Sequence, residues 1–75
     1  MPRLATDQWR VSFLNRAQVP PAVIEKDYVL SETCAGAFDK AIAKLRLVPE
    51  ADGFLMQNII YENEVAEFPG PRPNY

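Results

Sequence analysis

The chain of 75 residues contains no histidine and a single cysteine, Cys34. A zinc site needs several cysteine or histidine ligands, so this composition excludes one. A cysteine nucleophile needs a base such as histidine beside it, and the chain has none. One cysteine cannot close an intramolecular disulfide, which excludes a disulfide-stapled secreted domain and predicts a reducing, cytoplasmic setting. We therefore interpret Cys34 as a small core residue and predict neither catalytic nor metal-binding residues.

Glycine and long apolar runs are also scarce. The three glycines, Gly36, Gly53 and Gly70, are isolated, so the chain has no glycine-rich loop of the kind that cradles phosphate. No run of about 18 apolar residues could span a bilayer, and residues 1–7 lead into no apolar stretch typical of a signal peptide. The sequence thus predicts a chain without a membrane partner.

Basic residues are few in the C-terminal third. Residues 1–46 hold seven of the eight lysines and arginines and five of the ten acids, whereas residues 50–68 hold five acids and no basic residue. The net charge is −2. Binding to nucleic acid rests on clustered lysine and arginine, so we expect no nucleic-acid partner for this chain.

What the chain does contain is apolar surface, with 48% hydrophobic and 24% charged residues. This usage is ordinary for a globular domain and differs from that of a disordered chain. A chain of this length hides only about 60% of the surface that its unfolded form exposes. The sequence predicts one small domain of marginal stability.

Helical spacing dominates our prediction of the fold. Thr6 and Asp7 can cap a helix over about 7–17, whose apolar residues are Trp9, Phe13, Leu14 and Ala17. Pro20 and Pro21 end it and suit the start of a second helix over about 21–46. In that helix, steps of four and three join one stripe of residues: Ile24, Tyr28, Ser31, Ala35, Phe38, Ile42 and Leu45. Gly36 either breaks the second helix or allows another backbone to approach closely.

The last third is less regular. Residues 49–53 are predicted to form a loop. Residues 54–61 fit a helix that continues to about 66 or a strand, and we favour the helix because a lone strand would lack a partner. The Pro-rich tail 68–75 should be extended or disordered. The predicted fold class is mainly α: a fragment of two to four helices over 1–67, followed by a disordered tail.

One run of charged residues is the candidate site. Glu25, Lys26, Asp27 and Tyr28 offer two acids, a cation and a phenol within one predicted helical turn. Acids in a first helical turn face the positive end of the helix dipole, which favours a structural interpretation. Residues two apart also point to different sides of a helix, so the two acids form no convergent pair.

Residues 19–30, which read VPPAVIEKDYVL, resemble the N-terminal motif of the AbiEii/AbiGii-like nucleotidyltransferase toxins, in which a Pro-x-hydrophobic-Ile-Glu-Lys-Asp-Tyr run opens a helix. The resemblance implies a relative of toxin-antitoxin or phage-defence enzymes that transfer a nucleotide from a nucleoside triphosphate with magnesium (Mg). It carries over Glu25, Lys26, Asp27 and Tyr28 as motif residues. The glycine-rich turn and paired carboxylates that this chemistry needs do not follow Leu45. We therefore expect a truncated or degenerate N-terminal fragment that is inactive alone, binds no cofactor and is no enzyme as it stands.

The alternative is a small helical protein-interaction module. Its apolar helix face would bind a partner protein or a second copy, since exposed apolar patches mark interaction sites. The predicted face consists of Ile24, Tyr28, Phe38, Ile42 and Leu45.

Overall fold

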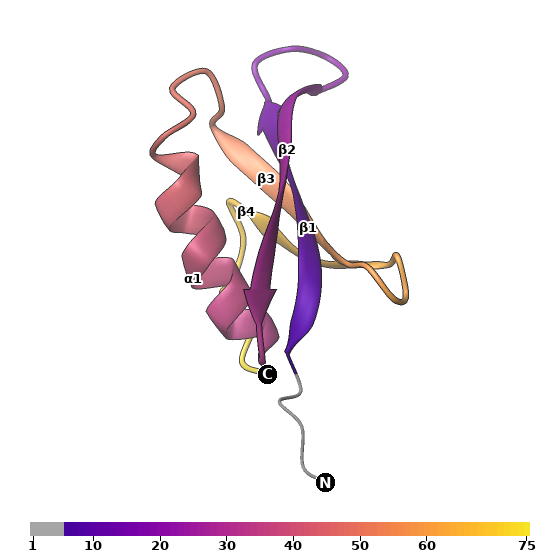
Figure 1. Ribbon diagram of the computed structural model, residues 1–75. Helices are drawn as coiled ribbons and strands as arrows, with labels where there is room; N and C mark the ends of the chain where they lie inside the picture. The colour runs from indigo at the N-terminus through magenta and orange to yellow at the C-terminus, as the bar shows by residue number, and fades with distance from the viewer. Residues whose placement is uncertain (1–5) are drawn as a thin grey trace, which may run out of the picture.

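The computed structural model describes residues 6–75 and shows four strands and one helix. The strands form one antiparallel sheet in the order β2-β1-β3-β4, and α1 covers one face of it (Figure 1). In chain order the elements are β1 (Asp7–Asn15), β2 (Ala22–Ser31), α1 (Cys34–Leu45), β3 (Gly53–Asn58) and β4 (Glu64–Phe68). The predicted fold class, mainly α, is wrong, because this is a mainly β domain with one short helix.

β1 replaces the helix predicted over 7–17. Trp9, Val11 and Phe13 alternate with polar residues, and all three are buried on the face that packs against α1. A repeat of two places side chains on one face of a strand, whereas a helix needs steps of three and four. Our prediction was wrong because it joined Trp9 to Phe13 and passed over Val11, which lies between them.

β2 occupies the first half of the helix predicted over 21–46. It pairs with β1 from Asp7↔Ser31 to Asn15↔Ala22, with one irregularity between Phe13 and Leu14. β2 contains the β-branched residues Val23, Ile24 and Val29, and β-branched residues favour strands. Pro20 and Pro21 do interrupt regular structure as predicted, but they lie in the connection between two strands rather than at the start of a helix.

α1 is the one part of the predicted helices that forms. Thr33 is its N-cap, and the Thr33 side chain accepts a hydrogen bond of 3.0 Å from the Gly36 N–H. Gly36 does not break the helix. A Cβ at this position would lie 2.5 Å from Ser31 Oγ, so the tight packing of a side chain, and not of another backbone, requires glycine here.

The core lies between α1 and the sheet and is centred on phenylalanine. The ring of Phe54 on β3 lies 6.2 Å from Phe13, 5.3 Å from Phe38 and 5.6 Å from Phe68, measured between centroids. Phe13 and Phe54 are fully buried, and Phe38 is 2% exposed. These contacts connect β1, α1, β3 and β4, so the aromatic cluster holds the helix layer on the sheet.

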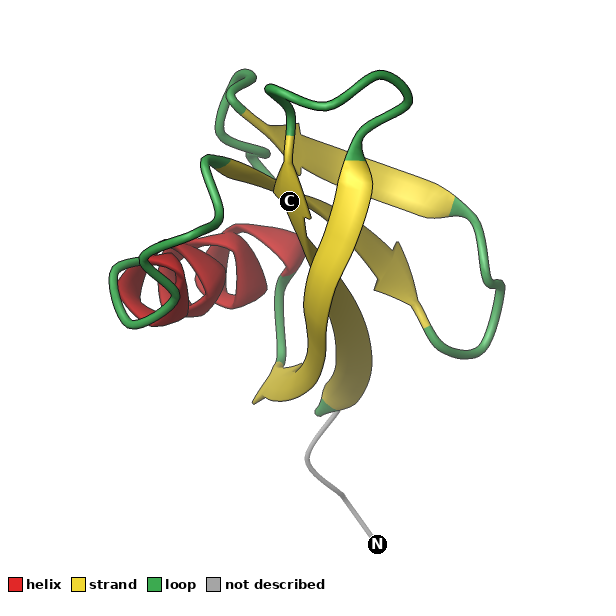
Figure 2. Ribbon diagram, turned by 90° about the horizontal axis from the view of Figure 1, so that it is seen from above, coloured by secondary structure: helices red, strands yellow, loops and turns green. Residues whose placement is uncertain are grey.

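β3 and β4 replace the helix predicted over about 54–66. The strand alternative is confirmed for residues 54–58, whereas 59–61 form a turn. This strand has a partner on both sides, since β3 pairs with β1 and with β4. The connection between β3 and β4 projects away from α1 (Figures 1 and 2).

The face of the sheet opposite α1 carries no second layer from the described residues (Figure 2). Tyr28 and Leu30 on β2 lie on this open face and are 49% and 58% exposed. None of the described residues belongs to a helix long and apolar enough to cross a membrane.

Candidate functional site

The sequence-predicted motif lies on β2, the strand at one edge of the sheet, and is not assembled into a site. Side chains alternate along a strand, so Asp27 faces α1 while Lys26 and Tyr28 face the other way. Asp27 pairs with Lys44 of α1 at 3.0 Å. The hydrogen bond from Lys44, followed by that from the Tyr28 N–H, holds the pKa of the Asp27 carboxyl below its ordinary value. Glu25 lies opposite Phe13 on the same face of the sheet as Asp27, and its side chain is exposed.

The predicted apolar helix face does not exist as a surface. Phe38 is buried in the core, and Ile42 and Leu45 pack against the same core from α1. Ile24 packs against it from β2, whereas Tyr28 points to the opposite side of the sheet. The predicted set thus mixes the inner surface of one helix with both faces of a strand, because the spacing was interpreted as one long helix.

Cys34 is 1% exposed at the start of α1, which agrees with the prediction of a small core residue. Burial raises the pKa of its thiol, and a hydrogen bond with the Tyr75 side chain opposes this in part. The thiol is therefore neutral near pH 7 and a poor nucleophile.

At the free edge of β2, side chains bind two of the outward-pointing backbone groups. Tyr28 donates its backbone N–H to Asp27 Oδ1 at 2.7 Å, and Lys40 Nζ donates to the Leu30 carbonyl oxygen. Both backbone groups point away from β1, so in an uncapped strand they would be open to another chain. Charged residues on an edge strand oppose pairing with a further strand. Within the charged motif, Asp27 is the residue whose side chain binds a backbone group of this edge.

The edge of β4 differs. In an antiparallel pair, residues alternate between those that bond to the neighbouring strand and those whose backbone groups point away. Ile59 donates to the Gln8 carbonyl oxygen at 3.2 Å, which fixes the alternation along β3 and assigns Ala66 and Phe68 of β4 to the side that bonds to β3. The N–H and C=O of Glu67 then point away from the sheet, and the carbonyl oxygen lies against Gly70, where a Cβ would come within 2.6 Å of it. Unlike β2, this edge is not capped by a charged side chain of the described residues.

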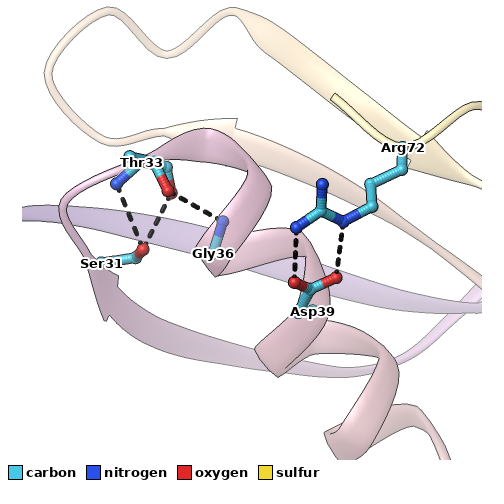
Figure 3. Close-up of polar contacts among 5 residues, drawn as sticks. All are labelled: Ser31, Thr33, Gly36, Asp39 and Arg72. Carbon is cyan, nitrogen blue, oxygen red and sulfur yellow. Dashed lines mark hydrogen bonds and ion pairs between the residues drawn. The ribbon is translucent and has the colours of Figure 1, made fainter. Parts of the chain in front are cut away.

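The C-terminal segment, residues 69–75, forms no helix or strand, yet it is held in place beside α1 (Figure 1). Arg72 makes two hydrogen bonds to the Asp39 carboxylate, at 2.9 and 2.7 Å (Figure 3). The backbone oxygen of Tyr75 accepts from the Ala35 N–H at 2.9 Å. We had expected an extended or disordered tail, and these contacts show that it is not disordered.

A groove lies between the outer edge of β4 and the C-terminal segment, and we call it the β4 groove. Its volume is about 470 Å³, and its lining residues are Glu64, Val65, Ala66, Glu67, Pro71, Arg72, Pro73, Asn74 and Tyr75. The Tyr75 hydroxyl bridges the groove at one point, where it donates to the Val65 carbonyl oxygen at 3.4 Å. The groove thus exposes backbone groups of an edge strand beside apolar proline rings.

The β4 groove carries negative charge. The Arg72 guanidinium is bound by Asp39, and this pair raises the pKa of Arg72 and lowers that of Asp39. Within residues 6–75, neither Glu64 nor Glu67 takes part in a salt bridge. In the same range, no group of three or more cysteine, aspartate and glutamate residues is placed to hold a metal ion. The β4 groove therefore combines the edge of a strand, a wall that contains Pro71 and Pro73, and two carboxylates. This combination suits binding rather than catalysis.

Sequence reasoning missed this site because Glu64 and Glu67 appeared only as part of an acidic region and the prolines only as a tail. The available signal was their order, in which acids without basic neighbours precede a Pro-rich end.

No known protein family matches the chain, and no curated protein or solved structure is significantly similar to it.

Proposed function

We propose that this chain is a small protein-binding module that takes up an extended segment of a partner protein as a fifth strand beside β4. The observation that carries the proposal is the contrast between the two sheet edges. At the β2 edge, charged side chains bind backbone groups of Tyr28 and Leu30, whereas the β4 edge lies along the β4 groove and its Val65 carbonyl oxygen accepts only from the uncharged Tyr75 hydroxyl.

Strand addition fits the dimensions of this edge. β4 has five residues, which at about 3.3 Å per residue present roughly 17 Å of edge. An added strand would lie about 4.8 Å from β4, between β4 and the C-terminal segment, and it would displace the Tyr75 hydroxyl from the Val65 carbonyl oxygen. Backbone hydrogen bonds would supply affinity, and side chains that point alternately to the two faces would supply specificity.

The expected partner is another protein or a second copy of the chain, and both stay predictions. The open strand edge favours an extended segment over the apolar helix face that the sequence had suggested. A second copy could bind only by offering an extended segment of its own.

The resemblance to AbiEii/AbiGii-like toxins also stays a prediction. The run that carries it, residues 19–30, lies on a turn and a strand, so our proposal does not rest on it. Incubation of the chain with magnesium, labelled nucleoside triphosphates and RNA tests whether it transfers nucleotides. Reproducible labelling of the RNA would contradict the expectation that the chain is inactive.

The binding proposal is tested by NMR titration of the isotope-labelled chain with short peptides that alternate valine with a polar residue. Binding should shift and protect the backbone N–H of Glu67 and leave residues 22–31 unchanged. A matched pair of variants supports the assignment. Glu67→Pro removes an N–H that points to the groove and should abolish binding without unfolding the sheet, whereas Ala66→Pro removes an N–H that faces β3 and should unfold it.

Protection on β2 instead of β4, or a peptide complex that survives Glu67→Pro unchanged, would refute the proposal. A peptide with proline at every alternate position serves as the control ligand, because it cannot form a strand ladder.

A further inference from the structure

We infer that the segment bound in the β4 groove carries lysine or arginine at alternate positions, with small or apolar residues between them. This inference rests on the proposed function and specifies the chemistry of its ligand.

The sheet register places both groove carboxylates on one face. Glu67 lies opposite Leu55, which lies opposite Ser12, and Glu64 lies opposite Gln57, which lies opposite Arg10. These rows run across the sheet on the face away from α1. The β3–β4 register is irregular between Met56 and Gln57, so the two glutamates are three residues apart on β4 while Leu55 and Gln57 are two apart on β3. A fifth strand that matches the spacing of β3 would extend both rows, so two of its side chains on that face would lie beside the two glutamates.

The other face of an added strand meets a different surface. Ala66 points toward α1, and the C-terminal segment brings Pro71, Pro73 and Tyr75 to the same groove. Small or apolar side chains fit between these groups, whereas a charge there would lose hydration without gaining a partner. The two faces together select a ligand that alternates basic and apolar residues.

Local charge supports the basic half of this pattern. Within 47–75 the only basic residue is Arg72, which is bound to Asp39, and Glu62 of the β3–β4 connection pairs with Arg10 at 3.4 Å. Glu64 and Glu67 therefore have no cation within the described residues. Opposite charges directly across two strands attract, and like charges repel.

The test compares three peptides that alternate valine with lysine, serine or glutamate, titrated into the full chain with backbone N–H shifts as the readout. We expect the lysine peptide to bind about fivefold more tightly than the serine peptide at low salt, since two cross-strand ion pairs contribute. The glutamate peptide should bind most weakly. The preference for lysine should shrink in about 1 M salt, where the screening length is about 3 Å.

Variants identify the carboxylates. The double variant E64Q/E67Q should lose the preference for lysine, whereas the control E32Q/E50Q removes the same charge from exposed residues outside the groove and should keep it. Equal binding of the lysine and serine peptides, or a preference that persists in E64Q/E67Q, overturns this inference and leaves strand addition intact. Failure of all three peptides to bind overturns the proposed function and the inference with it.

Discussion

Replacing Phe54 with alanine is the sharpest test of the fold, because its ring joins all parts of the core. It is fully buried and lies against Phe13, Phe38 and Phe68. Truncation of a buried phenylalanine to alanine costs about 3–5 kcal/mol, from lost burial and the cavity that remains. At about 0.05–0.15 kcal/mol per residue, the whole chain has roughly 4–11 kcal/mol of stability. We therefore expect Phe54→Ala to remove a large part of this stability, from about a third of it at the upper estimate to all of it at the lower.

Urea unfolding followed by far-UV circular dichroism measures this loss. Phe54→Leu, which keeps most of the volume, should lower the free energy of unfolding far less than Phe54→Ala. Ile60→Ala is the surface control, because this side chain is 69% exposed and its truncation should change stability by about 0.5 kcal/mol or less. A Phe54→Ala variant that loses less than about 1 kcal/mol would refute the shared aromatic core.

Two further predictions concern local contacts. Thr33→Ala removes the N-cap that accepts from the Gly36 N–H and should lower stability by about 1 kcal/mol in the same urea assay, with Thr33→Ser as a control that retains most of it. The pKa of Asp27 is lowered by Lys44, so its ionised form favours the folded state at pH values above the ordinary 3.8, and this contribution disappears as the pH falls through the lower folded-state pKa. Thermal melts should therefore show less loss of stability below about pH 4 for Asp27→Asn than for the parent chain, and identical acid profiles would contradict the ion pair.

The parts of the fold that depend on local chemistry could be predicted from the sequence. The interruption at Pro20 and Pro21 is confirmed, and the loop predicted over 49–53 is confirmed for 49–52, because proline restricts the backbone wherever it lies. The end of α1 at Leu45 also agrees with the predicted end at about 46. The start of α1 at Cys34 could not be predicted, because the apolar residues of 22–31 fit both the repeat of two of a strand and the repeat of four of a helix.

Strand pairing could not be predicted, because it joins residues far apart in the chain. Residues 54–58 are a strand since β1 and β4 lie on their two sides, and neither neighbour was recognised. A lone strand is unstable without a partner, so a helix was predicted for these residues. The rule is correct, but it was applied without the two neighbouring strands. Together with the missed repeat Trp9-Val11-Phe13, this led to errors in four of the five elements.

The same strand order determines which charged residues are available for binding. Glu25, Lys26 and Asp27 are the most concentrated charges of the chain, but they lie on β2, at the edge where Asp27 and Lys40 bind backbone groups. From the sequence, the acids of 50–68 indicated only that this region would repel phosphate groups. In the structure, two of them lie on β4, which is the edge strand beside the groove. Phe68 stacks on Phe54 with ring planes 14° apart, so the short β4 is anchored to the core while its outer edge stays accessible. An edge that is both anchored and accessible is what strand addition requires, and β4 is the strand that combines the two.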